Sequence, residues 1–366
     1  MTELSFGSSS LSFSTLSPLS LYINKDETDV LTKSDLTRWL DNNTFDKSVV
    51  WWKTSGTTGL PANIAFPEDY HKILIERYYR EILGVEIDDL MYLHLASPSL
   101  RPKGIVLEDD IEARKLKNNE YFLSPPRSCE QWSEEDLKRI YRELHDLKPD
   151  ILRVDPFYLL RFIVWAEEFG LTVPKIDVVV CSYSLLMKNT ALRIQSFFNC
   201  KVYELYGMSE VGPVWLREYG SNKKPTYSDI YLELRPIESY GSCYEVLVTT
   251  SRNTLYNLYR YQSNDVVKVK GSDIEFIGRR FHGFAFDNGT TYKELINDLE
   301  SNYKNILCSQ IEINDNRYLL KLVVSGKLIR GKSILRFLKK KTGLDFEISI
   351  VDWLTPESSG KFSIIS

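Results

Sequence analysis

The sequence contains few of the residues that build disulfide frameworks and metal centres. Of its 366 residues, 5 are cysteine and 4 are histidine. The cysteines are odd in number and widely spaced, and no pair has the spacing of metal ligands, so we expect buried, reduced thiols. The histidines are equally dispersed, which argues against structural zinc and against a catalytic Cys–His pair. The cysteines are Cys129, Cys181, Cys200, Cys243 and Cys308.

Long apolar runs and a strong excess of either charge are also missing. No uninterrupted apolar stretch reaches the ~18 residues expected of a membrane span. The segment from Met1 to Ser20 is rich in serine and has no basic start, so it makes a poor signal peptide. The formal net charge is -4, which gives no electrostatic reason to expect nucleic acid or an anionic membrane as a partner. We therefore expect a cytoplasmic protein.

Helix-like and strand-like segments alternate between residues 69 and 181. One helix has a capping-box start, in which Ser133 is the cap and Asp136 takes the place of the usual glutamate. The alternation predicts βαβ units and a largely parallel sheet flanked by helices. The expected helices are 69–83, 133–147 and 156–170, and the expected strands are 92–96, 151–154 and 176–181.

The pattern changes twice in the second half of the chain. After Asp229, alternating β-rich segments predict an added antiparallel layer. Beyond Arg279, short helices and strands predict a small α+β domain. We therefore expect an α/β protein with a large N-terminal domain, 1–279, and a small, mobile C-terminal domain, 280–366. The segments concerned are 244–249 and 266–269 in the first pattern, and helices 292–299 and 332–342 with strands 311–313, 318–324 and 346–351 in the second.

The run Lys53-Thr-Ser-Gly-Thr-Thr-Gly-Leu-Pro61 is the most informative segment. Hydroxyl side chains that alternate with glycines form a flexible backbone nest suited to a polyphosphate. The run is not a Walker A loop, because that motif needs Lys and then Ser or Thr after its last glycine, and Gly59 is followed by Leu60. Alone, it would be interpreted first as a surface turn. Three further segments change that interpretation.

These segments occur in a fixed order along the chain. They are Tyr203-Glu-Leu-Tyr-Gly-Met-Ser-Glu-Val-Gly-Pro213, Tyr259-Arg-Tyr-Gln-Ser-Asn-Asp265 and Ser359-Gly-Lys361. Together with the loop they make the chain resemble the adenylate-forming superfamily, and within it the phenylacetate-CoA ligase-like branch. That family has a Thr-Ser-Gly-Thr-Thr-Gly loop, a Tyr-Gly-x-Ser/Thr-Glu turn, a Tyr-Arg segment with a following Asp and a late Gly-Lys in this order. The resemblance extends from about Trp51 to Lys361.

The resemblance implies ATP-dependent activation of a carboxylic acid. The acid would form an acyl- or aryl-adenylate with release of pyrophosphate, and the acyl group would then pass to a thiol of CoA or of carrier-protein phosphopantetheine. Such a site must hold the β and γ phosphates and neutralise the charge that develops at the α phosphate. ATP and Mg²⁺ are therefore the implied cofactors.

The same resemblance assigns the catalytic roles. Ser209 would contact the α phosphate, and Glu210 would bind Mg²⁺, which prefers carboxylate oxygen. Lys361, on a mobile lid, would bridge the substrate carboxylate and the α phosphate. Without the other motifs, Glu210 would be interpreted as a surface carboxylate and Lys361 as an exposed loop lysine. The phosphates would be held by Thr54, Ser55, Gly56, Thr57, Thr58 and Gly59.

The remaining assignments concern the nucleoside. Tyr206, followed by Gly207, would stack on adenine. Ser182 belongs to the second adenine-contacting segment. Asp265 would accept hydrogen bonds from the ribose hydroxyls, and Arg279 would approach the same ribose or the phosphates.

Three positions depart from the family pattern. Ala62 follows the loop proline where many members have lysine, although Lys53 precedes the loop. Phe281 stands where the family often has the carboxylate of a Gly-Arg-x-Asp hinge. Tyr183 lies in a segment that reads Cys-Ser-Tyr-Ser in place of Gly-Ala-Glu-Pro. These departures keep open a degenerate relative that binds nucleotide or acyl-adenylate without catalysis, while the retained polar groups of the other motifs favour the enzyme.

The acid and the acceptor are less determined. Aromatic side chains in the segments around the expected acid pocket favour a planar aromatic acid, with aliphatic acids and amino acids as alternatives. A thiol acceptor is favoured because Arg279, Arg280, Lys293 and the run Lys339–Lys341 could meet the phosphates of CoA or the acidic face of a carrier protein. An amine acceptor, which would give an amide, is the alternative.

Overall fold

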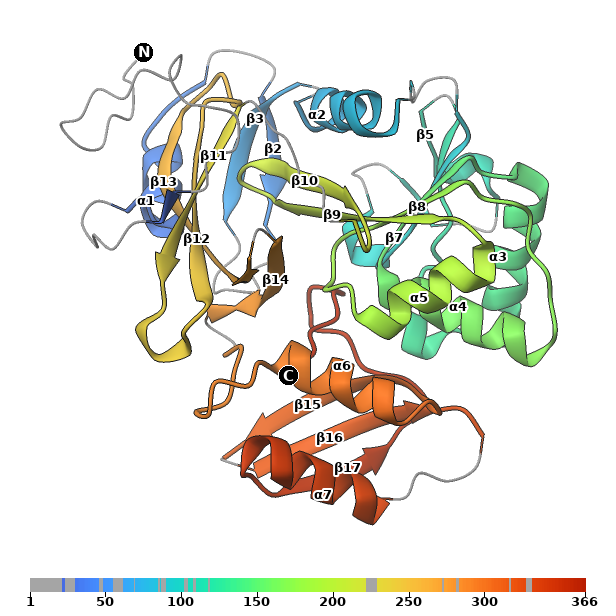
Figure 1. Ribbon diagram of the computed structural model, residues 1–366. Coiled ribbons are helices and arrows are strands. Elements are labelled where there is room, and N and C mark those ends of the chain that lie inside the picture. The colour runs from blue at the N-terminus through green and yellow to red at the C-terminus, as the bar shows by residue number, and fades with distance from the viewer. Residues whose placement is uncertain are drawn as a thin grey trace. The chain divides into compact units, whose positions relative to one another are not determined.

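The chain forms two compact units in the computed structural model (Figure 1). Unit 1 consists of Met1–Gly84, Leu205–Arg217 and Ser221–Phe284, and unit 2 consists of Val85–Glu204, Glu218–Gly220 and Ala285–Ser366. The structure describes residues 22–23, 30–45, 49–54, 62–68, 70–84, 86, 90–101, 105–107, 110–117, 119–221, 229–271, 273–280, 283–315, 317–326 and 331–366.

A five-stranded sheet forms the core of unit 1. Its strand order is β1-β11-β12-β13-β14, and all neighbouring strands are antiparallel except β1 and β11. This sheet is the antiparallel layer that the sequence predicts. The Tyr259–Asp265 motif lies inside its longest strand. The strands are β1 (Tyr22–Ile23), β11 (Ile230–Pro236), β12 (Cys243–Thr250), β13 (Leu258–Lys270) and β14 (Asp273–Arg279), with the 3₁₀ turn η7 (Glu238–Tyr240) between β11 and β12.

A hairpin and a capped helix lie beside that sheet. The hairpin strands β2 (Val49–Lys53) and β3 (Asn63–Pro67) are antiparallel. Helix α1 (Lys33–Asp41) starts at a capping box, in which Thr32 and Asp35 exchange hydrogen bonds with each other's backbone N–H groups. Its buried leucines lie four residues apart, on one face of the helix. The helix packs against β3 and β13, so its first turn is held close to two of the motifs.

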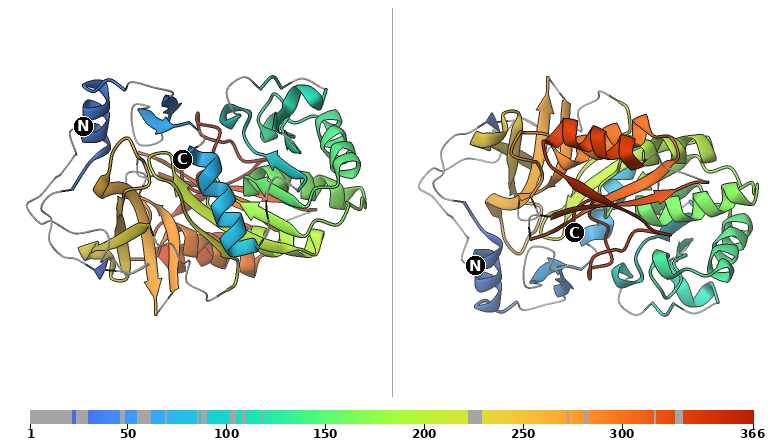
Figure 2. Two further views of the ribbon diagram at one scale, coloured as in Figure 1. Left: turned by 90° about the horizontal axis from the view of Figure 1, so that it is seen from above. Right: turned by 90° about the horizontal axis from the view of Figure 1, so that it is seen from below.

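The expected helix over 69–83 is two elements in the structure. Helix α2 (Tyr70–Tyr78) continues as a π-helical turn, η2 (Tyr79–Leu83), which ends at Gly84 with φ of 71°. A glycine takes this left-handed conformation without steric cost, which explains the end of the helix. Helix α2 lies across β10 (Gly212–Glu218), as seen from above in Figure 2.

Unit 2 contains a mostly parallel sheet. It belongs to a seven-stranded sheet of order β10-β9-β8-β7-β4-β6-β5, in which β9, β8, β7, β4 and β6 are parallel and β5 is antiparallel to β6. The central strands β4 and β8 are almost wholly buried, which is typical of parallel strands covered on both faces. β9 starts in unit 2 and ends in unit 1, where β10 follows it. The strands are β4 (Tyr92–Leu95), β5 (Lys115–Lys117), β6 (Glu120–Phe122), β7 (Ile151–Val154), β8 (Val178–Cys181) and β9 (Lys201–Met208).

The helices of unit 2 follow the sequence signals closely. Helix α3 begins with the predicted capping box of Ser133 and Asp136. Helix α4 begins at Pro156, preceded by Asp155, whose carboxylate accepts the Phe157 N–H at 3.0 Å. α4 packs against both α3 and α5. The helices are α3 (Glu134–Leu147), α4 (Pro156–Glu168) and α5 (Lys188–Phe198), with short 3₁₀ turns η4 (Pro98–Leu100), η5 (Glu112–Arg114) and η6 (Cys129–Gln131).

The C-terminal part of unit 2 is the predicted α+β arrangement. Helices α6 and α7 pack against each other on one face of a three-stranded sheet of order β15-β16-β17 (Figure 2). α6 and β15 also pack against α5, and for this reason the C-terminal part belongs to unit 2. The division into domains at Arg279 stays a prediction. The elements are α6 (Tyr292–Asn302), α7 (Gly331–Thr342), β15 (Ile306–Asn314), β16 (Arg317–Val324) and β17 (Phe346–Ile350).

The expected fold class is confirmed. All five cysteines are free, and all but the half-buried Cys200 are buried. Burial raises the pKa of the Cys129, Cys181 and Cys308 thiols well above the ordinary value, as expected of unreactive core residues. Among the described residues, no helix combines the length and the apolar character needed to cross a membrane.

Candidate active site

The turn between β9 and β10 presents two of the predicted catalytic residues. Ser209 and Glu210 lie between the two strands, and the Val211 N–H closes the turn on Met208 O at 3.3 Å. Gly207 is required here, because a Cβ at this position would lie 2.7 Å from the carbonyl oxygen of Gly212. The strands can approach this closely only when residue 207 lacks a side chain.

Asp265 is the centre of a buried polar cluster in unit 1. Its side chain is 2% exposed. One carboxylate oxygen, Oδ2, accepts the Tyr206 hydroxyl at 2.6 Å, and the other, Oδ1, lies 3.1 Å from Arg279 Nε. The structure thus brings together three residues that the sequence assigns to the nucleoside. Burial and the Asp265 charge raise the pKa of Tyr206 well above its ordinary value, so the phenol stays protonated and donates to the carboxylate.

The Tyr206 ring lies against other aromatic rings. Its centroid is 4.1 Å from that of Trp215 and 5.2 Å from that of Phe276. These contacts fix the orientation of the phenol and therefore of its hydrogen bond to Asp265. The stacking of Tyr206 on adenine stays a prediction.

Glu210 belongs to a second cluster, which includes a residue that the sequence analysis missed. The residue is 8% exposed, and its Oε1 lies 3.7 Å from Lys33 Nζ. The Lys33 ammonium also donates to Thr54 Oγ1 at 2.8 Å. Burial, then the charge of Glu210 and a hydrogen bond with it, raise the pKa of Tyr261 well above its ordinary value. Strand β13 therefore contributes to this cluster as well.

Thr54 closes the base of the predicted phosphate loop. Its N–H donates to Ala62 O at 2.8 Å, and its hydroxyl oxygen accepts the Ala62 N–H at 2.9 Å. The backbone bond continues the pairing of β2 and β3 to Thr54 and Ala62, and the hydroxyl bond reinforces it. The other predicted phosphate-binding residues, Ser55, Gly56, Thr57, Thr58 and Gly59, lie outside the described residues.

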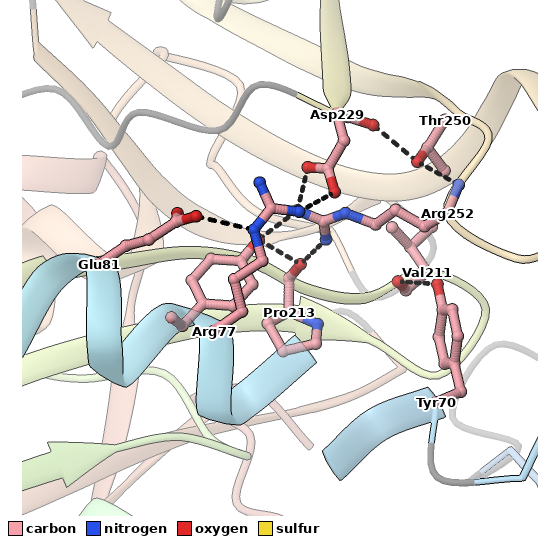
Figure 3. A network of polar contacts seen from close by, with 9 residues as sticks. Tyr70, Arg77, Glu81, Val211, Pro213, Asp229, Thr250 and Arg252 are labelled. Atoms are coloured by element: carbon pink, nitrogen blue, oxygen red, sulfur yellow. Dashed lines mark hydrogen bonds and ion pairs between the residues drawn. The ribbon is translucent and has the colours of Figure 1, made fainter. Parts of the chain in front are cut away.

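A polar network fixes the backbone directly after Glu210 (Figure 3). The Tyr70 hydroxyl donates to Val211 O at 2.9 Å, and Arg252 donates to Pro213 O. Arg252 is itself held by Asp229, 2.7 Å from its Nη2. Arg77 of α2 lies 2.7 Å from the other oxygen of that carboxylate. Helix α2 and the strands of unit 1 thus position the turn that bears Glu210.

A separate cluster in unit 2 contains Lys361. The Lys361 charge reaches Asp155, the residue that caps α4. The pKa of Asp155 is raised from 3.8 to about 7, mainly because the carboxyl group is buried. The hydrogen bonds from Ser184 and from the backbone, and then the Lys361 charge, act in the opposite direction but do not offset the burial. The Phe362 N–H donates to Ser184 Oγ at 2.9 Å. The predicted catalytic lysine therefore lies close enough to this buried carboxyl group for its charge to lower the carboxyl pKa.

The segment that bears Lys361 packs tightly against η4. Ser99 Oγ donates to Ser359 O at 2.6 Å. Gly360 has φ of 76°, and a Cβ there would lie 1.8 Å from Ser97 Oγ. The Phe362 ring stacks on Phe157, with centroids 5.0 Å apart. Phe157, in the first turn of α4, therefore packs against the segment that bears Lys361.

Ser182 follows β8 and lies in unit 2. It is buried and accepts a hydrogen bond from Arg153 Nε at 3.1 Å. The Arg153 guanidinium also lies 5.0 Å from the centre of the Tyr183 ring. Tyr183 has φ of 75°, a left-handed conformation that is uncommon for a residue with a side chain.

The donor set around Glu210 fits a magnesium ion that is bound together with phosphate. Among the described residues, no group of three or more His, Cys, Asp or Glu side chains could hold a metal ion. Mg²⁺ bound with a nucleotide typically takes only one or two carboxylates, because phosphate oxygens and waters fill its other positions. A single buried carboxylate meets this requirement.

The sequence analysis missed Lys33 and Asp155. Lys33 and Asp155 both lie at helix starts, next to Thr32 and Pro156, and these helix-start signals were the only sequence signs of their location. Neither belongs to one of the four motifs.

Comparison with known proteins yields structural neighbours. No family model and no curated protein matches the chain. Among solved structures, it is similar to 2-hydroxyisobutyryl-CoA ligase in the postadenylation state in complex with R3-HIB-AMP, with a TM-score of 0.68 and 16% identity over 93% of this chain and 80% of that chain. It is similar to a benzoate CoA ligase from Burkholderia xenovorans LB400, with a TM-score of 0.62 and 14% identity over 87% of this chain and 68% of that chain.

A third neighbour is an anthranilate CoA ligase in complex with anthranoyl-AMP. Its TM-score is 0.63 and its identity 13%, over 86% of this chain and 66% of that chain. The chain therefore has the fold of acyl- and aryl-CoA ligases, and the resemblance to the adenylate-forming superfamily is confirmed for the fold. The phenylacetate-CoA ligase-like branch stays a prediction.

Proposed function

We propose that this chain, which has the fold of acyl- and aryl-CoA ligases, activates a carboxylic acid with ATP and passes the acyl group to a thiol. In the first step, a carboxylate oxygen of the acid attacks the α phosphorus of ATP and pyrophosphate leaves. In the second step, the thiol sulfur attacks the acyl carbon, and AMP leaves with the bonding electrons while the thiol proton is released to solvent.

The buried Asp265 carboxylate is the observation that supports this function best. Tyr206 and Arg279 hold its two oxygens in fixed directions, and a carboxylate retains further lone pairs that can accept from ribose hydroxyls. Burial of a charge costs free energy unless it is paired and hydrogen-bonded. A carboxylate in a surface turn would be solvated by water and would not require Tyr206 and Arg279 as partners. A buried carboxylate that binds ribose hydroxyls does require them.

The second cluster supplies the phosphate end of the site. Thr54 anchors the base of the loop by its backbone and hydroxyl bonds to Ala62. Ser209 would contact the α phosphate. Glu210 would hold Mg²⁺, which supplies positive charge to the phosphates.

Lys361 would act on the first step by binding the substrate carboxylate and the α phosphate. A lysine placed in advance costs no reorganisation when charge develops in the transition state. Its backbone is fixed by the Ser99 bond to Ser359 O and by the Phe362 bond to Ser184. Both contacts serve to orient the ammonium.

Exchange of labelled pyrophosphate into ATP tests the proposal. The exchange is measured with a panel of aromatic, aliphatic and amino acids, and Asp265→Ala serves as the variant that removes the ribose contact. We expect exchange with at least one acid and a loss on the order of 10² in the variant, the size of a lost charge-assisted contact in the transition state. ATP binding without exchange for any acid would favour the non-catalytic relative instead.

The acceptor is tested separately, once an acid is known. With the acid, ATP and either CoA or a phosphopantetheine-bearing carrier protein, mass spectrometry should detect an acyl thioester. Adenylate that persists with both thiols and is consumed by an amine such as lysine would contradict the thiol acceptor.

A further inference from the structure

Lys33 links two motif segments that are distant in the sequence. Its ammonium lies 2.8 Å from Thr54 Oγ1, at the base of the loop, and 3.7 Å from Glu210 Oε1, at the end of β9. The Lys33 side chain is 22% exposed, so the cation is held mainly inside unit 1. An exposed lysine would instead keep its ammonium in water and gain little from such contacts.

The fold fixes the position of Lys33 strongly. The Thr32 capping box sets the start of α1 at Lys33. Leu31, two residues before Lys33, is tied to the motif strand β13 by two backbone hydrogen bonds. Its N–H donates to Arg260 O at 3.2 Å, and its carbonyl oxygen accepts the Gln262 N–H at 2.9 Å. Because a lysine loses considerable rotamer freedom when its ammonium is held, this placement needs a compensating interaction.

We propose that Lys33 is a phosphate-binding residue that contacts the β or γ phosphate of ATP. This inference rests on the proposed function. An ammonium has three donors on a flexible stem, so it can keep its bond to Thr54 and donate to a phosphate oxygen as well. Lys33 lies between Thr54, at the base of the loop, and Glu210, which would hold Mg²⁺. We expect the terminal phosphates of ATP to bind in this same place.

The sequence after the loop leaves a place for such a cation. Position 62 is alanine, so the residue after the loop proline brings no charge. A tri- or tetra-anionic polyphosphate keeps a net negative charge even when one Mg²⁺ is bound, so a further cation at this end of the site stabilises it. Lys33 supplies this charge from a different part of the chain.

Lys33→Met tests the inference, because it removes the charge and keeps an unbranched side chain. Arg38→Met is the matched control: Arg38 lies on the same helix, its side chain is 73% exposed, and its ion pair with Asp35 is long, at 4.0 Å. Binding of ATP and of AMP to both variants is measured by calorimetry, and thermal unfolding checks that both are folded.

We expect Lys33→Met to weaken ATP binding roughly 10- to 100-fold, the size of a lost charged hydrogen bond. Binding of AMP, which lacks the β and γ phosphates, should stay unchanged, and Arg38→Met should match the wild type with both nucleotides. Lys33→Arg should restore part of the ATP affinity.

Two results would overturn the inference while leaving the proposed function intact. One is an equal loss of ATP and AMP binding in a folded Lys33→Met variant, which would make Lys33 a support for Thr54 and Glu210. The other is ATP binding in Lys33→Met equal to that in Arg38→Met. A wild-type chain that binds neither nucleotide would overturn the proposed function itself, and this inference with it.

Discussion

The roles that we assign to individual side chains depend on their burial and on a small number of charged neighbours. Asp265 and Glu210 are both carboxylates of a motif, yet the first is held by a tyrosine and an arginine and the second by a lysine. Fixed partners on both oxygens suit a hydroxyl-binding role. Glu210, whose Oε1 lies 3.7 Å from Lys33 Nζ, suits a role in binding a metal cation through its carboxylate oxygens.

Lys361→Ala should abolish adenylate formation and largely spare transfer from a supplied acyl-adenylate. The lysine acts on the α phosphate, which is altered only in the first step. A loss on the order of 10² or more in the exchange rate, about 2.7 kcal/mol of barrier, is expected for a preorganised charge. Pyrophosphate exchange and single-turnover thioester formation measure the two steps. An unchanged exchange rate would remove Lys361 from the mechanism.

Asp155 should make stability depend on pH. Its pKa in the folded chain is about 7 and its ordinary value is 3.8, so between these values the folded state keeps a proton that the unfolded state releases. The contribution of Asp155 to the free energy of unfolding is therefore complete below about pH 4. It falls as pH rises, by at most about 1.4 kcal/mol per pH unit, and levels off above pH 7.

Asp155→Asn should remove this slope, because the asparagine oxygen can still cap α4 and its amide can donate to Ser184 Oγ, but the side chain does not ionise. Urea unfolding between pH 4 and 8 measures the difference between variant and wild type. Glu300, whose pKa burial raises to about 8, contributes a slope of the same sign to both proteins, so it cancels. Parallel stability curves for the two proteins would contradict the assignment.

At the scale of elements, the segment that bears Lys361 depends on a glycine. Gly360→Ala would place a Cβ 1.8 Å from Ser97 Oγ and 2.5 Å from Ser99 Oγ, so the segment must move off η4. We expect the exchange rate to fall about as far as in Lys361→Ala, on the order of 10², because the lysine is no longer aligned.

Gly343→Ala is the matched control for that variant. Gly343 also has φ of 76°, but a Cβ there has nothing within 4 Å. Both substitutions strain the backbone by about 1 kcal/mol, and only Gly360→Ala adds the clash. Thermal unfolding should show a similar cost of backbone strain in both variants. A Gly343→Ala variant that lost as much exchange activity as Gly360→Ala would refute the steric explanation.

At the scale of the whole molecule, the chain passes from unit 1 to unit 2 for the last time between Phe284 and Ala285. We expect limited proteolysis to cut first around Gly278 to Gly289, and less readily with ATP and the acid present, because ligands of a closing lid protect its hinge. Gel electrophoresis with mass spectrometry locates the cuts. First cleavage inside α4 or β13, with this region resistant, would show that the mobile part lies elsewhere.

The sequence by itself determined the elements and the order of the motifs. The Ser133 capping box, the parallel strands and the α+β pattern at the C-terminus could be predicted because they depend on residues close together in the chain. The pairing of Tyr206 with Asp265 was not predicted as a contact, although both residues were assigned to the nucleoside.

Only the tertiary structure decided which distant residues meet. Lys33 joins Thr54 and Glu210 because α1 packs against β3 and β13. The Lys361 charge reaches Asp155 because the segment that bears it bonds to Ser99 of η4 and stacks Phe362 on Phe157 of α4. Neither Lys33 nor Asp155 has a sequence signal of function, since each acquires its neighbours through long-range packing. Local patterns fix helices and strands, whereas burial and charge pairing depend on which surfaces come together.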